Sequence, residues 1–93
     1  MPQVTLTSHL INQAGLEKVS QPLSIPGATV RQVIDALCGE HPRLRGYLLD
    51  DQGVLRQHVA AFVNGAVVRD KTLLAQPLAA DDELSLFQAL SGG

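Results

Sequence analysis

The stretch Thr29–Cys38, which reads TVRQVIDALC, decides the fold because it contains the clearest helix pattern in the sequence. Its apolar side chains recur at helical spacing and form one stripe, and the Thr29 hydroxyl can cap the first turn. Gly39 and Pro42 follow and are typical of a helix end. The stripe consists of Val30, Val33, Ile34, Leu37 and Cys38. A lone helix with one apolar stripe needs a layer of another kind to cover it.

The residues before this helix predict two strands. Residues 3–8 alternate apolar and polar side chains, which is typical of a half-buried strand. Residues 17–25 resume the alternation, but Pro22 places that strand at a sheet edge or at a bulge. Between them, residues 12–15 are typical of a turn, so we expect the two strands to form a hairpin.

The residues after the helix predict a second hairpin and a final strand. Residues 58–63 form a continuous apolar run, and Asn64-Gly65 is a strong hairpin signal because both residues tolerate positive φ. Residues 66–68 should pair back, and residues 83–90 should form the last strand. In the intervening segment we expect a short helical turn that fills a core edge with Leu44, Leu48 and Leu49.

These elements together predict an α+β chain with the β-grasp fold, in which one main helix packs across a mixed four- or five-stranded sheet. The last strand should run down the middle, parallel to the first, because it is apolar and follows a long connection. Residues 1–90 form the expected domain, and residues 91–93 form a flexible tail that ends in Gly92 and Gly93.

Composition argues against several classes of function. The net charge is −2, and there are no Trp, one Tyr and two Phe residues, which disfavours nucleic-acid binding. The chain has no apolar run near the roughly 18 residues of a membrane span and no signal-peptide pattern, so we expect a cytoplasmic protein. The spread of the histidines predicts no metal site, and Cys38 is expected in the core rather than in sulfur chemistry.

Four segments resemble the MoaD/ThiS family of ubiquitin-like sulfur carriers, in the order in which that family has them. They are residues 28–37, residues 62–65, residues 78–86 and residues 90–93. The chain departs from the family in lacking the usual turn glycine near residue 81 and in having a longer segment between residues 41 and 58. The longer segment resembles carriers that serve amino-acid biosynthesis and argues against a molybdopterin role.

The resemblance implies that the working group is the carboxylate of Gly93. A partner resembling the ubiquitin-activating enzymes would adenylate it with ATP, a sulfur donor would convert it to a thiocarboxylate, and a downstream enzyme would accept the sulfur. The chain would then be a carrier and not an enzyme, unless it is the small subunit of a molybdopterin-synthase-like complex, and it would bind no cofactor. Gly92 and Gly93 suit the role because a backbone without Cβ atoms fits a narrow channel.

The family also docks on partners through an apolar sheet surface. Strand alternation places Phe87 on the face opposite Leu84 and Leu86, so Phe87 should face outward if the helix covers the leucines. Phe62 and Val63 lie on opposite faces of their strand, so one belongs to the core and the other can extend the surface. The resemblance implies docking by Phe87, Leu90, Phe62 and Arg69.

Two alternatives remain beside the sulfur carrier. The chain could be a ubiquitin-like modifier that is joined to lysines of other proteins through Gly93, or a β-grasp binding module without chemistry at its end. Within the sulfur-carrier interpretation, the acceptor could belong to cysteine or methionine, molybdopterin or thiamin biosynthesis, or could be a tRNA base.

Overall fold

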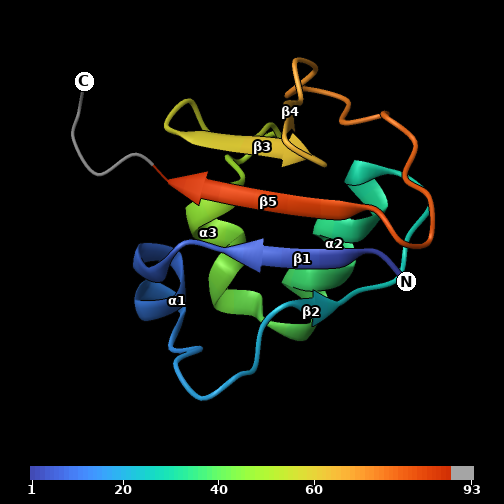
Figure 1. Cartoon of the computed structure of the whole chain (residues 1–93). Helices are drawn as coiled ribbons and strands as arrows, with labels where there is room; N and C mark the ends of the chain where they lie inside the picture. The colour runs from blue at the N-terminus through green and yellow to red at the C-terminus, as the bar shows by residue number, and fades with distance from the viewer. Residues whose placement is uncertain (89–93) are drawn as a thin grey trace.

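A computed structural model describes residues 1–88, and they adopt the β-grasp fold predicted from the sequence (Figure 1). One mixed sheet of five strands is covered on one face by helices. The elements in chain order are β1 (Gln3–Leu6), α1 (Ser8–Ala14), β2 (Leu23–Ser24), α2 (Val30–Glu40), the 3-10 helix η1 (Pro42–Leu44), α3 (Arg45–Leu48), β3 (Val59–Val63), β4 (Ala66–Val67) and β5 (Glu83–Gln88).

The predicted main helix is α2, and its capping is as expected. The Thr29 hydroxyl accepts a hydrogen bond from the Gln32 amide at 3.2 Å, which satisfies one of the free amides of the first turn. The Gln32 side chain in turn accepts a bond from the Ala28 amide at 2.8 Å, so the two bonds together fix where the helix begins. All five residues of the apolar stripe are buried against the sheet.

The strand order is β2-β1-β5-β3-β4, which confirms that the last strand occupies the middle of the sheet. β5 runs parallel to β1 and antiparallel to β3, and both neighbours are visible beside it in Figure 1. The register pairs Leu6 with Leu86, and both side chains lie in the core beneath the helices. A crossover through α2 and the second hairpin is what allows β1 and β5 to be parallel neighbours.

The predicted first hairpin is wrong in its connection, although its two strands do pair. The segment predicted to contain a turn forms α1 instead, because Leu10 and Ala14 stand four residues apart and both become buried. Gly15 ends this helix with φ of 71°, a conformation that glycine adopts without strain. β2 keeps only two residues and lies at the edge of the sheet, where the preceding Pro22 predicted it.

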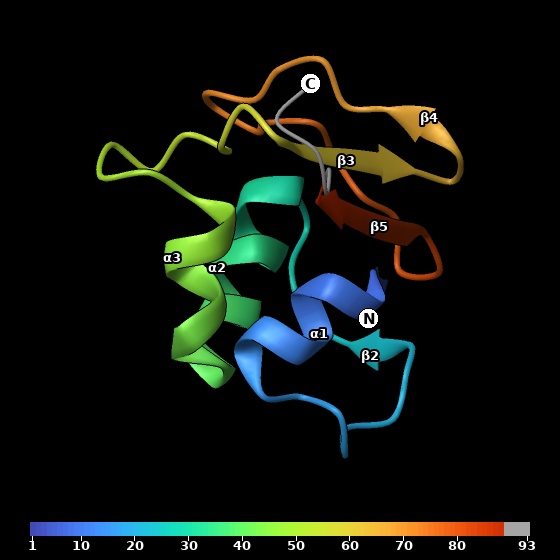
Figure 2. The same ribbon diagram turned by 90° about the vertical axis from the view of Figure 1, so that its left-hand side faces the viewer.

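The segment between α2 and β3 closes one end of the core, as predicted. Leu44, Leu48 and Leu49 are fully or almost fully buried, and they come from η1, α3 and the residue after α3. Figure 2 shows α2 and α3 together on one side of the sheet. The opposite face, which we call the outer face, is therefore the one available for a functional surface.

Candidate functional site

The outer face exposes a phenylalanine close to the end of β5. Leu84 and Leu86 point into the core with no exposed surface, whereas Phe87 is 48% exposed on the other side of the same strand. The helices cover the leucine face, so the outward orientation predicted from the alternation is what the structure has. A large side chain held half in solvent on a rigid central strand is available to a partner.

Phe62 lies beside Phe87, which settles the ambiguity between Phe62 and Val63. Val63 is buried in the core, and the Phe62 ring lies on the outer face with its centre 5.3 Å from that of Phe87 and tilted by 50°. The neighbouring positions on this face belong to Ala60, paired with Phe87, and to Val67, paired with Phe62 and 46% exposed. We call this set the outer patch; its members are Ala60, Phe62, Val67 and Phe87.

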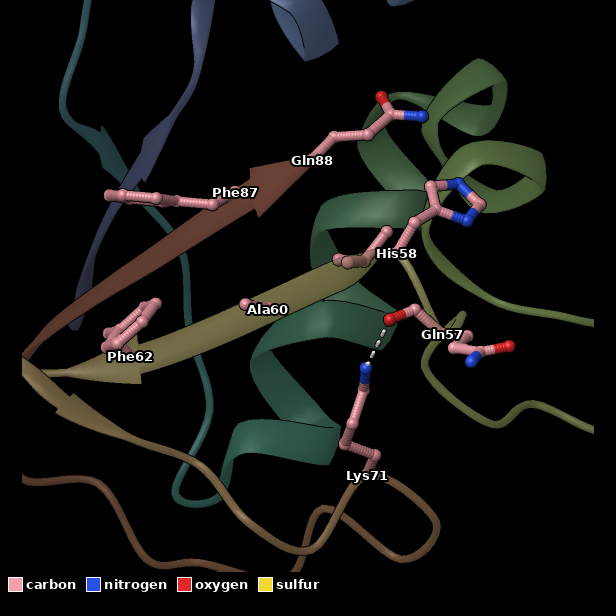
Figure 3. Close-up of a pocket in the computed structure, with 8 residues that line it drawn as sticks. Gln57, His58, Ala60, Phe62, Lys71, Phe87 and Gln88 are labelled. Carbon is pink, nitrogen blue, oxygen red and sulfur yellow. Dashed lines mark hydrogen bonds between the residues drawn. The ribbon is translucent and has the colours of Figure 1, made fainter. Parts of the chain in front are cut away.

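A groove of about 410 Å³ runs along the outer patch toward the beginning of β3 and the end of β5, which lie side by side. Its apolar lining includes Phe62 and Phe87, which project from neighbouring strands to the same side (Figure 3). The Lys71 ammonium borders it and donates a hydrogen bond to the Gln57 carbonyl at 3.2 Å. The remaining lining residues are His58, Val59, Ala60 and Gln88.

His58 and Lys71 were not singled out by sequence reasoning as members of this site. His58 immediately precedes β3, and its alternation with Ala60 and Phe62 was a usable signal that it shares their face. Lys71 comes from a loop, and nothing in the local sequence indicates that this loop returns to the start of β3. Its position depends on the path of residues 68–71 after β4.

The other predicted site residues have different outcomes. Arg69 is exposed and follows Val68, whose amide donates to the Ala61 carbonyl at 2.8 Å; this bond brings the segment alongside β3. Leu90, Gly92 and Gly93 lie outside the described residues. The described chain ends at Gln88, which borders the groove, so the outer patch and the last described residue of β5 are adjacent.

Hydrogen bonds between the second hairpin and the turn before β5 fix the position of the central strand. The Asn64 side chain donates to the Asp82 carboxylate at 3.0 Å and accepts from the Glu83 amide at 2.9 Å. The Ala79 amide also donates to Asp82 at 2.8 Å, and these two bonds, the Ala79 bond foremost, lower the pKa of Asp82. Asn64 therefore supports the strand as well as making the turn, where its φ is 50°.

Cys38 is buried in the core on the stripe of α2, as the sequence predicted. Burial raises the pKa of its thiol; the nearby Arg45 acts in the opposite direction with a smaller effect. A thiol with a raised pKa and little exposed surface is a poor nucleophile at neutral pH. Cys38 therefore packs in the core as a small apolar side chain.

The outer face offers an apolar groove that can accommodate an apolar side chain. One cationic group, the Lys71 ammonium, lies at the border of this groove. Within residues 1–88 no three His, Cys, Asp or Glu side chains gather closely enough to hold a metal ion. The helices in the same part of the chain are too short or too polar to cross a membrane. The two aromatic rings and the groove make this face the candidate site of the described chain.

The parallel pairing of β1 with a central β5, the helix across one face and the apolar outer patch define a ubiquitin-like β-grasp protein. The ThiS family model matches residues 4–93, which is nearly the whole chain. The chain belongs to the ThiS family, as the resemblance in its sequence indicated.

Individual relatives agree with this assignment. The small archaeal modifier protein 1 of Haloferax volcanii is 41% identical over 66 residues, or 71% of each chain. A crystal structure of that protein from the same organism has a TM-score of 0.75 at 34% identity and covers 98% of this chain and 97% of its own. A chain in the BexX/CysO complex of Amycolatopsis orientalis has a TM-score of 0.82 at 24% identity, with full coverage of both chains; at that identity the likeness concerns the fold.

Proposed function

We propose that this protein is a sulfur carrier whose Gly93 carboxylate is adenylated and then converted to a thiocarboxylate. The observation that carries the proposal is the match to the ThiS family, which extends through residue 93 and so includes Gly92 and Gly93. In this proposal a partner enzyme consumes ATP in the adenylation step, and the reaction takes place in the cytoplasm. The sulfur then passes to an acceptor in a biosynthetic pathway.

The chemistry explains why a partner is needed. A carboxylate is a poor electrophile, so one of its oxygens first attacks the α-phosphorus of ATP and pyrophosphate leaves. Hydrosulfide from a sulfur donor then attacks the acyl carbon of the adenylate, AMP leaves and a proton is released. The product is a thiocarboxylate, which is more nucleophilic than the carboxylate. The contribution of the carrier is to place the reacting carbon in the partner's active site.

The outer patch supports this role because it supplies a docking surface on the strand that leads to the tail. In this proposal Phe87 and Phe62 insert into an apolar site of the adenylating enzyme, and Leu90 and Arg69 extend the contact. Aromatic side chains that are exposed on a rigid scaffold are frequent anchors of such interfaces. β5 is the central strand, and its last described residue, Gln88, lines the groove, so docking on this face holds the partner next to the end of that strand.

A second candidate function is protein modification through Gly93. The relative that is 41% identical is a modifier protein, which favours this alternative over a module without chemistry at its end. Both functions share the adenylate and differ in the nucleophile that attacks it. A lysine gives a covalent conjugate that resists reductants, whereas hydrosulfide gives a thiocarboxylate.

ATP–pyrophosphate exchange with the cognate adenylating enzyme tests the proposal. We expect exchange with the wild-type chain and a large loss with Gly93→Ala, because a Cβ at this position obstructs entry into a narrow channel. Gly39→Ala is the matched control, since a Cβ added at this exposed helical site meets no atom within 4 Å. Exchange by Gly93→Ala at the same rate as by Gly39→Ala would refute the proposal.

A further inference from the structure

The loop between β4 and β5 contains a stretch that places no side chain in the core. Residues 69–73 are all exposed or partly exposed, and Leu73 is 69% exposed. The stretch follows Val68, which is buried and whose amide donates to the Ala61 carbonyl on β3, and it precedes Leu74, which is fully buried. We call residues 69–73 the strap. Because the strap buries no apolar side chain, polar contacts must hold it against the rest of the protein.

Arg31 makes polar contacts to the strap from the first turn of α2. Its guanidinium donates to the carbonyl oxygens of Thr72 at 2.9 Å and Leu73 at 3.5 Å. The same group donates to the Gly53 carbonyl at 2.7 Å and pairs with the Asp35 carboxylate at 3.7 Å. One side chain therefore joins α2, the strap and the turn that contains Gly53.

The strap is also folded upon itself by Asp70. The Asp70 carboxylate accepts hydrogen bonds from the amides of Leu73 at 2.9 Å, Thr72 at 3.2 Å and Ala75 at 3.5 Å. These bonds close a tight turn between neighbours in the sequence. Since they do not connect the strap to another element, the strap can keep its shape when it moves.

The strap carries Lys71 to the groove of the candidate site. The Lys71 carbonyl accepts from the Leu55 amide at 3.0 Å, and the Lys71 ammonium donates to the Gln57 carbonyl at 3.2 Å (Figure 3). Both bonds attach the strap to the segment before β3, and neither involves Arg31. The place of this ammonium at the border of the groove therefore depends on where the strap lies.

We propose that the strap opens and closes as one unit and that Arg31 holds it closed. Opening breaks the bonds of the guanidinium to the strap together with the two bonds of Lys71, while Val68 and Leu74 stay in place. The Lys71 ammonium then leaves the groove, so the cationic group at the border of the candidate site belongs to the closed state. Arg31 is a positioning residue for Lys71. The inference goes beyond the proposed function and does not depend on the chemistry at the chain end.

Amide hydrogen exchange of the unmodified protein tests whether the strap opens by itself. The Leu55 amide, which donates to Lys71, is released when the strap opens, whereas the amides of the central strand β5 are released only by global unfolding. The Leu55 amide should therefore have a larger opening equilibrium constant than the slowest amides of β5. Equal constants would show that the strap does not open separately and would overturn the inference.

Replacement of Arg31 tests whether this residue holds the strap. Arg31→Met should raise the opening constant of the Leu55 amide about tenfold, as expected when a hydrogen bond to a charged group is lost. Arg43→Met is the matched control, because the Arg43 guanidinium also bonds a carbonyl oxygen, that of Gln13 at 3.4 Å, but outside the strap. This control should leave the Leu55 constant within about twofold of wild type, since opening of the strap does not break that bond. An equal rise in both variants would mean that global unfolding releases Leu55, which contradicts the inference.

Limited digestion with trypsin tests whether opening releases Lys71. Trypsin must take the Lys71 side chain into its own specificity pocket before it cleaves the bond to Thr72, so cleavage requires this side chain to leave the groove. At low protease concentration the rate follows the population of the open form, and mass spectrometry should find cleavage after Lys71 about tenfold faster in Arg31→Met than in wild type. Faster exchange at Leu55 without faster cleavage after Lys71 would also overturn the inference.

Arg31→Lys provides a second variant, which remains informative if circular dichroism shows that Arg31→Met does not fold. A lysine keeps the positive charge next to Asp35, but its single ammonium cannot reproduce the planar fork that reaches the strap and Gly53 together. We therefore expect Arg31→Lys to raise both the Leu55 opening constant and the cleavage rate after Lys71. Wild-type values for this variant would show that positive charge alone holds the strap and would contradict the role of the guanidinium.

Discussion

At the scale of single residues, Phe87 shows how a local pattern determines which side chains are exposed on the candidate site. The alternation along β5 places Leu84 and Leu86 in the core and leaves Phe87 on the outer face, and this part of the site could be predicted from the sequence. Which of Phe62 and Val63 belongs to the core could not be predicted, because alternation fixes only that their side chains lie on opposite faces of the sheet. It is decided by the register that pairs Val63 with the buried Leu84.

Truncation of this side chain gives a direct prediction. Phe87→Ala should raise the KM for the carrier in pyrophosphate exchange roughly thirtyfold, since an interface anchor is worth about 2 kcal/mol. Its free energy of unfolding should fall by only about 1 kcal/mol, because the side chain is 48% exposed and the truncation removes its contact with the Phe62 ring. Leu73→Ala is the control: Leu73 is 69% exposed on a loop that contacts α2, away from the outer patch. Equal KM values for the two variants would contradict the docking role.

The core position of Cys38 leads to a second prediction at this scale. The folded protein should react slowly with an aromatic disulfide reagent at neutral pH, because the thiol is 5% exposed and its pKa is raised by burial. In denaturant the rate should rise to that of a free thiol, as followed by absorbance. Fast reaction of the native protein would show that Cys38 is accessible and would reopen a role in sulfur transfer.

At the scale of elements, predictability followed the strength of the local signals. α2 has a cap, an apolar stripe and a stop within one segment, and the second hairpin has Asn64-Gly65, so both were predicted. α1 spans only two turns, and its polar Asn12 and Gln13 resemble a turn when read alone. The helix is stabilised by the burial of Leu10 in the core. This packing involves residues distant in the sequence, so a short stretch of sequence does not indicate it.

The turn before β5 carries a prediction about pH. The pKa of Asp82 is lowered in the folded state, first by the Ala79 amide and then by Asn64. Its contribution to stability is therefore present above the unfolded pKa and is lost as the pH falls through the lower folded pKa. Between pH 7 and about pH 2.5, wild type should lose more unfolding free energy than Asp82→Asn, as measured by urea denaturation. Asp81→Asn is the control, because the Asp81 carboxylate makes no hydrogen bond to the described residues; this variant should lose as much unfolding free energy as wild type. If Asp82→Asn showed the full wild-type pH dependence, Asp82 would not be the source of the lost stability.

At the scale of the whole molecule, the β-grasp body leaves the outer face of its sheet uncovered by helices, and the proposed function uses this face for docking. The order of elements predicted the central, parallel β5, because an apolar last strand after a long connection has few other places to pair. The position of Lys71 on the groove could not be predicted, since it depends on the course of a loop between distant strands. The match to the ThiS family covers residues 4–93, so it includes both the outer patch and Gly93, to which the proposed chemistry is assigned.

Mass spectrometry of the intact chain tests the central claim most directly. After incubation with the cognate adenylating enzyme, ATP and hydrosulfide, the wild-type chain should gain the mass difference between one sulfur and one oxygen atom, and fragmentation should place the change on Gly93. A chain that lacks Gly92 and Gly93 should gain nothing under the same conditions. The same gain in the shortened chain, or a gain located at another residue, would contradict the claim that Gly93 carries the sulfur.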